Sequence, residues 1–189
     1  MNLKIITSTN RPGAKGIRIA QWIAAQVAEA QLFDIELLDL AVINLPFMDE
    51  PEHPRLQRYT HEHTKLWSQT ISDADAFIIA LGEYNHGFPA PIKNAIDYLV
   101  KEWAYKPVAL VSYGGTSGGL RAMAMLKPTL LALNMMPLSE SVSVPFFSRY
   151  FNADDQFLPD NHVKKSTETM ITELHRWSLA LKGMRSGGV

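Results

Sequence analysis

Residues 76–99 read AFIIALGEYNHGFPAPIKNAIDYL, and this stretch decides the fold. It opens with a continuous apolar run, AFIIAL, which is typical of a strand that is covered on both faces. A loop rich in polar residues, glycine and proline follows, and a helical pattern then runs from Pro91 to Trp103. A buried strand that leads through a loop into a helix is the repeating unit of a parallel α/β sheet.

The same unit recurs on both sides of this stretch. The predicted strands are Leu3–Thr7, Phe33–Leu40, Ala76–Leu81, Lys106–Tyr113 and Met136–Val144. The predicted helices are Ile17–Gln31, Leu56–Ser72, Pro91–Trp103, Leu120–Met135 and Asn161–Lys182. Pro128 is expected to bend or interrupt the fourth helix, and a Gly-rich tail follows the fifth. This alternation indicates one α/β domain over residues 1–189, with a doubly wound five-stranded parallel sheet in the order 2-1-3-4-5 and helices on both faces.

Composition narrows the class of protein. The chain of 189 residues has a formal net charge of −1, which argues against a nucleic-acid binder and against a strongly acidic electron carrier. It has no cysteine, so disulfides, thiolate nucleophiles and zinc–sulfur sites are excluded. The sequence contains neither a signal-peptide pattern nor an apolar run of membrane-spanning length. We expect a cytoplasmic protein with no membrane partner.

In a sheet of this order, the loops after the first and third strands meet at the carboxyl edge, where ligands bind. The first of these loops, TSTNRPGAKGIR at residues 7–18, places hydroxyls, basic side chains and glycines around the start of a helix. Such groups can bind a phosphate. The loop matches neither GxGxxG nor GxxxxGK[ST], which disfavours the usual dinucleotide and nucleoside-triphosphate sites. A capped helix with a solvated basic turn is the alternative.

The loop after the third strand contains EYNHG at residues 83–87. Its main-chain groups suit the edge of a flat heterocycle, Tyr84 offers a ring, and Gly87 permits a positive φ or a close approach. The alternative is a rigid turn with a buried Tyr84. In the helix behind it, Asn94 and Asp97 could simply cap or bond locally.

The loop after the fourth strand, SYGGTSGG at residues 112–119, lies beside the second one in this topology. A backbone without side chains can lie close to a planar ring, and the helix that starts at Leu120 favours negative charge at its N-terminus. A flexible loop is the alternative.

Other candidate residues point to no specific chemistry. His61 and His63 are expected on different sides of a helix whose apolar side carries Leu66, Trp67 and Ile71. The histidine spacing suggests no metal site, and a GxSxG nucleophile elbow is absent. The loop after the last strand is unusually aromatic and contains Phe146, Phe147, Tyr150 and Phe151. These residues either form a partner surface or lid, or they cover the sheet edge or pack against the last helix, and in a dimer both could hold.

The combination of TSTNRPGAKG, EYNHGFPAPIKNAIDYL and KPVALVSYGGTSGGLRA resembles the NADPH-dependent FMN reductase family of flavodoxin-like proteins, which includes quinone, azo-dye and chromate reductases. The likeness runs from about Leu3 to Pro137. It implies a flavodoxin-like three-layer sandwich, non-covalent FMN and NAD(P)H as electron donor. It also implies a homodimer or homotetramer that pairs near the flavin sites. Asn10 and Gly82 depart from the Thr and Pro that are usual in the family.

The resemblance also implies which residues bind the flavin. The first loop would hold the FMN phosphate, and the other two would line the isoalloxazine ring, largely through main chain. The implied residues are Thr9, Arg11, Lys15, Gly16, Ile17 and Arg18, then Glu83, Tyr84, Asn85 and His86, and finally Ser112, Tyr113, Gly114 and Gly115. No catalytic side chain is implied, although Asn85, His86 or Tyr113 could shape the open side of the ring or donate a proton.

The implied activity is that of an FMN-dependent NAD(P)H oxidoreductase. A hydride would pass from NAD(P)H to the flavin, and a quinone-like or other small acceptor would then take two electrons. Two alternatives stay open: a non-catalytic flavodoxin-like electron carrier or flavin-binding protein, and a protein of the same fold that binds another ligand or a partner. The near-neutral charge disfavours the carrier.

Overall fold

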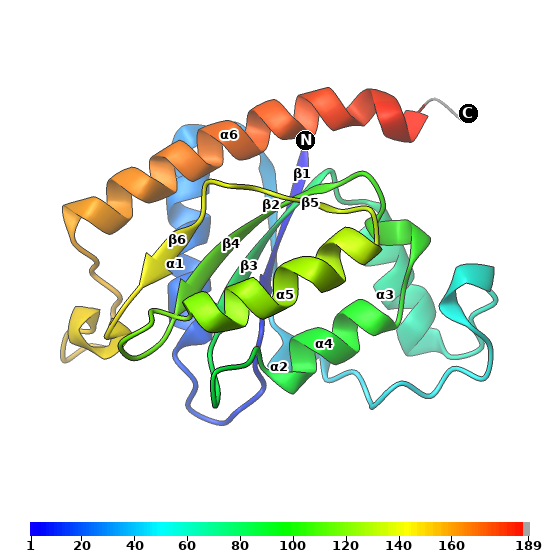
Figure 1. Cartoon of the computed structure of the whole chain (residues 1–189), viewed down its shortest axis with the longest axis horizontal. Helices are drawn as coiled ribbons and strands as arrows, with labels where there is room; N and C mark the ends of the chain where they lie inside the picture. The colour runs from blue at the N-terminus through cyan, green and yellow to red at the C-terminus, as the bar shows by residue number, and fades with distance from the viewer. Residues whose placement is uncertain (187–189) are drawn as a thin grey trace.

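The computed structural model describes residues 1–186 and has a parallel sheet at its centre (Figure 1). The strand order is β2-β1-β3-β4-β5, and β6 also pairs with β4. The strands are β1 (Asn2–Thr7), β2 (Asp34–Leu38), β3 (Ala76–Gly82), β4 (Pro107–Tyr113), β5 (Met136–Pro137) and β6 (Val142–Val144). The predicted order 2-1-3-4-5 is confirmed, and it places the topological switch point between β1 and β3.

The edge of the sheet differs from the prediction of one strand over Met136–Val144. Two short strands, β5 and β6, both pair in parallel with β4. Met136 is opposite Pro107, whereas Val142 is opposite Val111, so the chain gains two residues on β4 between the two pairings. Those extra residues leave the ladder, as in a bulge, and this interrupts the strand.

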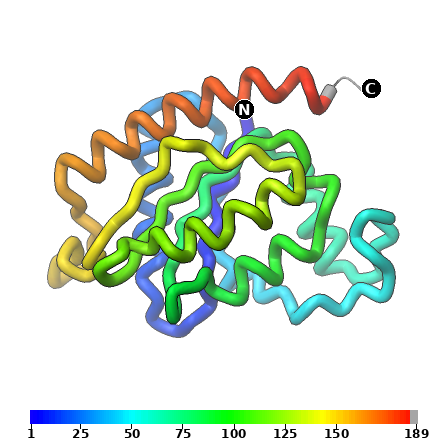
Figure 2. Tube along the Cα trace, viewed as in Figure 1, coloured from blue at the N-terminus to red at the C-terminus, as the bar shows by residue number. Residues whose placement is uncertain are grey.

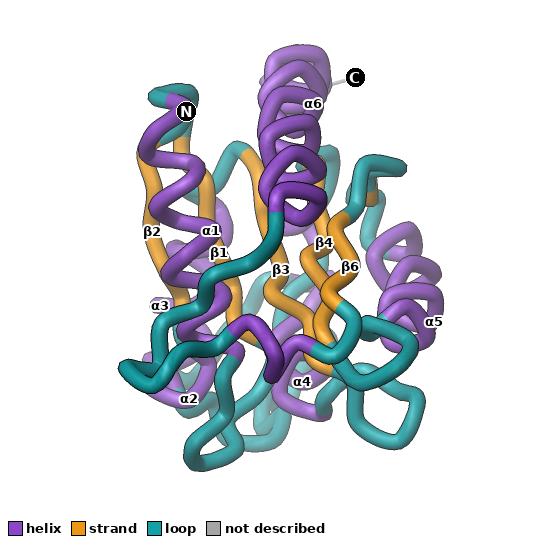
Figure 3. Tube along the Cα trace, turned by 90° about the vertical axis from the view of Figure 1, so that its left-hand side faces the viewer, coloured by secondary structure: helices purple, strands orange, loops and turns teal. Residues whose placement is uncertain are grey.

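Helices cover both faces of the sheet (Figure 3). The buried side chains of α1 and α6 pack on one face, and those of α3, α4 and α5 pack on the other. The helices are α1 (Gly16–Ala30), α2 (Leu40–Ile43), α3 (Glu62–Ser72), α4 (Ala90–Asp97), α5 (Leu120–Ala132) and α6 (Asn161–Ser186), with short 3-10 turns η1 (Pro54–Leu56), η2 (Lys101–Trp103) and η3 (Phe147–Tyr150). The predicted three-layer sandwich is confirmed.

The helix predicted over Leu56–Ser72 begins later, at Glu62. Trp67 and Ile71 are buried, as predicted, but Leu66 is 64% exposed. The prediction that Leu66 lies on the apolar side is therefore wrong, because the buried stripe of α3 follows the spacing of four that joins Trp67 to Ile71.

Three other helices differ from the sequence pattern. α4 ends at Asp97, and η2 forms a separate turn. Pro128 lies inside α5 without interrupting it. α6 continues to Ser186, and the rest of the Gly-rich tail, residues 187–189, lies outside the described residues.

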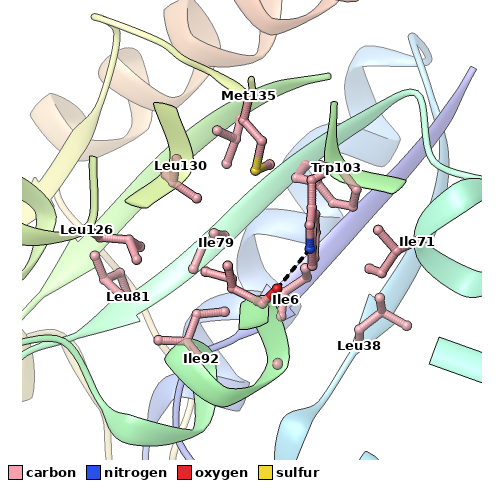
Figure 4. Packing of buried hydrophobic residues seen from close by; sticks show 14 of the residues in the cluster. Ile6, Leu38, Ile71, Ile79, Leu81, Ile92, Trp103, Leu126, Leu130 and Met135 are labelled. Atoms are coloured by element: carbon pink, nitrogen blue, oxygen red, sulfur yellow. Dashed lines mark hydrogen bonds between the residues drawn. The ribbon is translucent and has the colours of Figure 1, made fainter. Parts of the chain in front are cut away.

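The core has two halves because successive residues of a strand face opposite sides of the sheet. Phe77, Ile79 and Leu81 point towards α3, α4 and α5, whereas Ile78 and Ala80 point towards α1 and α6. Figure 4 shows the first half, in which the indole N–H of Trp103 donates to the carbonyl of Ile96 at 3.1 Å. Both faces of β3 are therefore buried away from solvent, which explains its continuous apolar sequence.

The N-terminus and the end of α6 lie on the side of the molecule away from the predicted ligand loops (Figure 2). Near the end of α6, Arg185 donates to a carboxylate oxygen of Asp75 at 2.7 Å and to the carbonyl of Tyr105 at 3.1 Å. These contacts place α6 across the amino edge and leave the carboxyl edge to the loops. Among residues 1–186, no helix combines the length and the apolar character that crossing a bilayer requires.

Candidate functional site

The three loops singled out in the sequence meet at the carboxyl edge of the sheet. The hydroxyl of Ser8, after β1, accepts a hydrogen bond of 2.8 Å from the N–H of Gly82 at the end of β3. The carboxylate of Glu83 accepts one of 2.7 Å from the hydroxyl of Ser117, after β4. The loops therefore converge as the topology predicts, and hydrogen bonds from their side chains hold them together.

The first loop leads into a helix start that has the features of an anion site. Thr9 is buried, and Arg11 lies exposed beside it. α1 begins at Gly16 with no side-chain cap on its first N–H groups and no acidic residue in its first turn, which also contains Ile17. Uncapped N–H groups at the start of a 15-residue helix carry a partial positive charge. This donor set fits a phosphate group.

The other two basic residues of this region already have an acidic partner. Lys15 and Arg18 both form ion pairs with the carboxylate of Asp155, which comes from the loop before α6. The hydrogen bond from Lys15, aided by that from Arg18, holds the pKa of Asp155 below its usual value. Sequence reasoning missed Asp155 because it lies far along the chain from both partners.

The second loop is a tight turn. Tyr84 and Gly87 exchange two backbone hydrogen bonds of 2.9 Å each. Between them, Asn85 has a φ of 49° and His86 a φ of 69°, as a type I′ turn requires at both central positions. Gly87 does not use the positive φ that its sequence permits, since the turn places its positive-φ residues at Asn85 and His86. All three residues from Tyr84 to His86 are exposed, so the alternative of a buried Tyr84 is wrong.

Glu83 ties this turn to the helix behind the third loop. Its side chain is only 9% exposed, and it accepts hydrogen bonds from the N–H groups of Arg121 at 3.1 Å and Ala122 at 3.3 Å. Burial opposes its ionisation, but these bonds and the one from Ser117 outweigh burial and lower the pKa of Glu83. The carboxylate therefore caps α5.

The third loop rests on a buried tyrosine. Tyr113 is 6% exposed, and burial raises its pKa to about 12, so its hydroxyl stays protonated at neutral pH. That hydroxyl fills the space where a side chain at Gly16 would otherwise lie, and it also lies against Gly82. Tyr113 thus supports the first two loops from below. In the same loop the hydroxyl of Ser112 donates to the carbonyl of Gly118 at 2.8 Å.

The glycines of the third loop allow close backbone packing. A side chain at Gly114 would meet the backbone of Gly119, whereas the space around Gly115 is open and Gly115 is exposed. This part of the loop therefore offers bare main chain beside the turn at Tyr84.

A cavity of about 330 Å³ lies next to the first loop, between α4 and the segment that follows α2. It is lined by Asn10, Leu40, Phe47, Pro91 and Asn94, among others. The amide of Asn94 donates to the carbonyl of Pro46 at 2.7 Å and accepts from the N–H of Met48 at 3.0 Å. The expectation of purely local bonding is wrong for Asn94, while Asp97 pairs locally with Lys93.

Two further expectations can be compared with the structure. The rings of His61 and His63 stack at 5.2 Å, because His61 precedes α3 in an extended conformation; the prediction that they diverge is wrong. In the aromatic loop, Phe147 packs edge-on against Tyr113 at 5.2 Å. Phe147, Tyr150 and Phe151 are partly buried against the half of the core that includes β6 and α6, which confirms the packing alternative for them, whereas Phe146 is 51% exposed.

One known protein family matches most of this chain. Residues 1–149 match the family described as NADPH-dependent FMN reductase. The chain belongs to this family. The resemblance to the FMN reductase family that was inferred from the three loop motifs is therefore confirmed.

Two relatives illustrate the activities found among similar proteins. An NAD(P)H-dependent FMN reductase from a Nectria species is 44% identical over 108 residues, which are 54% of this chain and 53% of that protein. An NAD(P)H:quinone oxidoreductase from Solanum tuberosum is 32% identical over 127 residues, or 63% of this chain and 64% of that protein. The matched segment thus spans about half of the first relative and less than two thirds of the second.

A solved structure shares the fold over nearly the whole chain. The flavoenzyme NAD(P)H:(acceptor) oxidoreductase from Paracoccus denitrificans superposes with a TM-score of 0.73 at 21% identity, covering 95% of this chain and 97% of that one. At this identity the likeness shows the fold, which is the flavodoxin-like order found here.

Proposed function

We propose that this chain is an FMN-dependent NAD(P)H oxidoreductase that reduces a quinone-like or other small acceptor. The observation that carries the proposal is the pairing of two features at the switch point of the sheet. One is the uncapped start of α1 beside Thr9 and Arg11, and the other is the exposed turn at Tyr84, whose hydroxyl contacts Thr9. Membership of the FMN reductase family supports the same assignment.

The first loop binds the phosphate of FMN in this proposal. The N–H groups of Gly16 and Ile17, the hydroxyl of Thr9 and the guanidinium of Arg11 are the donors, and Lys15 and Arg18 add positive charge. A phosphate held at the helix start fixes the position of the flavin along the edge of the sheet.

The other two loops position the ring. Main chain from Glu83 to His86 borders it on one side, and main chain from Ser112 to Gly115 borders it on the other. Bound non-covalently, FMN supplies the hydride acceptor and the two-electron donor, so no protein nucleophile is needed. The chain contributes position and electrostatics, and the exposed side chains of Asn85 and His86 shape the open side where NAD(P)H and the acceptor alternate.

We also propose that the protein is a homodimer or homotetramer in the cytoplasm. Phe47, which lines the cavity beside α4, is 84% exposed, and Val42 and Met48 in the same segment of the chain are 81% and 37% exposed. An exposed apolar patch next to a ligand site suits contact between subunits. Light scattering of the purified protein measures the assembly state, and a monomeric mass would contradict this part of the proposal.

The test of the activity is spectroscopic. FMN is added to the purified full chain, the excess is removed, and the visible spectrum is recorded before and after NADPH or NADH is added without oxygen. We expect a bound yellow flavin that bleaches, and that regains its colour when a quinone is added.

Each other outcome points to a different protein. Bound flavin that neither nucleotide bleaches would favour the electron carrier. Failure to retain flavin, measured again at equilibrium by fluorescence, would mean that the three loops bind another ligand.

A further inference from the structure

The ion pairs of Asp155 concern the same residues that the proposed function assigns to the flavin phosphate. Asp155 lies in the short loop 151–157, where a bridge pairs Phe151 with Phe157. Inside this loop the side-chain oxygen of Asn152 accepts hydrogen bonds from the N–H groups of Asp154 at 3.1 Å and Gln156 at 2.9 Å. These bonds fix the conformation of the loop, which holds Asp155 against the basic residues at the start of α1.

The two carboxylate oxygens of Asp155 are divided between the two cations. Oδ1 accepts from the ammonium of Lys15, and Oδ2 accepts from Nε of Arg18 at 3.3 Å. Lys15 also lies 5.5 Å above the ring of Phe151, so its side chain is directed towards the loop. Arg11, in contrast, makes its bond of 3.3 Å to the phenol of Tyr84. Two of the three basic side chains near the α1 start are thus held by a carboxylate.

We propose that Asp155 sets the affinity of the site for the phosphate of its ligand by competing for Lys15 and Arg18. This inference rests on the proposed function, because it takes the start of α1 to be the phosphate site. A carboxylate and a phosphate bind the same ammonium and guanidinium donors, and two anions that share these donors repel one another. Asp155 therefore weakens FMN binding selectively and leaves riboflavin, which lacks the phosphate, unaffected.

The exposure of the three charged side chains limits how much Asp155 can change the affinity for FMN. The side chains of Lys15, Arg18 and Asp155 are 42%, 48% and 38% exposed, so water and salt screen their interactions. A change of about fivefold in the dissociation constant for FMN is the scale expected from exposed pairs. An FMN site weakened in this way exchanges its flavin more readily with solution.

The experiment compares Asp155→Asn with Asp154→Asn. Asn suits the loop backbone, since Asp155 has a φ of 60° and Asn tolerates this left-handed region. Asp154 is the exposed neighbour, so its replacement removes the same charge one residue away. FMN and riboflavin are titrated into each full-length variant, and quenching of flavin fluorescence gives the dissociation constants at low salt and at about 1 M salt, where the screening length is about 3 Å.

We expect D155N to bind FMN about fivefold more tightly at low salt, with riboflavin binding unchanged and the gain reduced at high salt. The D154N variant should change FMN binding much less. Weaker or unchanged FMN binding in D155N, or an equal gain in D154N, would overturn the inference while leaving the proposed function intact. A wild-type protein that binds no FMN would overturn both.

Discussion

The hydroxyl oxygens of Thr9 and Tyr84 lie 2.9 Å apart, and this contact joins the first of the proposed ligand loops to the second. Nε of Arg11 donates to the same phenol at 3.3 Å. A tyrosine that is 42% exposed thus holds two side chains of the proposed phosphate site and, through its own backbone, anchors the type I′ turn. Tyr84 therefore connects the phosphate end of the proposed flavin site to its ring end.

We predict that Tyr84→Phe raises the dissociation constant for FMN about three- to tenfold, because Thr9 and Arg11 lose their shared partner. Protein stability should change by less than about 1 kcal/mol, since the side chain is partly exposed. Flavin fluorescence quenching and thermal unfolding measure the two effects. Tyr105→Phe is the matched control, as Tyr105 is 41% exposed and lies at the opposite edge of the sheet. Equal FMN affinity in both variants would contradict the linkage.

The hydroxyl of Tyr113 leaves no room for a side chain at Gly16, so replacing Gly16 should destabilise the protein. A methyl group at Gly16 would overlap the tyrosine hydroxyl, so Gly16→Ala should lower the free energy of unfolding by about 1–3 kcal/mol and weaken FMN binding. The double variant Gly16→Ala/Tyr113→Phe should recover part of the loss, as urea unfolding would record. Gly183→Ala is the control, because the space around Gly183 is open. Additive losses in the double variant would show that the overlap is not the cause.

Much of the fold is predictable because buried parallel strands have a strong signature. The run at β3 is apolar on both faces, and its position between helical segments leaves few possible topologies. Once β1 and β3 are neighbours, the loops after them must meet. The convergence of Ser8, Glu83 and Ser117 is therefore a consequence of strand order, which sequence periodicity can reveal.

What the sequence did not reveal depends on contacts between distant segments. Asp155 pairs with Lys15 across 140 residues, and nothing in its local sequence separates it from Asp154. Asn94 looks like a local helix residue until the segment after α2 is placed against it. The positive φ of Asn85 and His86 was not predicted for a different reason, because only Gly87 was considered for that conformation although Asn and His also adopt it.

Asn94 should stabilise the segment that borders the cavity. Replacing Asn94 with Ala removes a bond to the carbonyl of Pro46 and another from the N–H of Met48. We expect a loss of about 1–2 kcal/mol in the free energy of unfolding, measured by urea denaturation. Asp97→Asn, an exposed change on the same helix, should cost less than about 0.5 kcal/mol. Similar losses in both variants would mean that the bonds of Asn94 add nothing beyond helix stability.

Glu83 should give the protein a specific response to acid. Its pKa is lowered in the folded protein, so its ionised form contributes stability above the unfolded pKa of about 4.3, and this contribution is lost as the pH falls through the lower folded value. Glu83→Gln removes the charge while keeping the shape, and at pH 7 it should cost about 1–2 kcal/mol through weaker capping of α5. The gap between wild type and variant should narrow below about pH 4.

Urea unfolding at neutral and acidic pH tests this expectation, with Glu62→Gln as the control. The side chain of Glu62 is 82% exposed, so the control should stay within about 0.5 kcal/mol of wild type at both pH values. Since Glu83 also joins the turn at Tyr84 to the loop at Ser117, its replacement should weaken FMN binding at neutral pH as well. The absence of a gap at neutral pH would show that the shape shared by Glu and Gln, and not the charge of Glu83, holds α5 against the site.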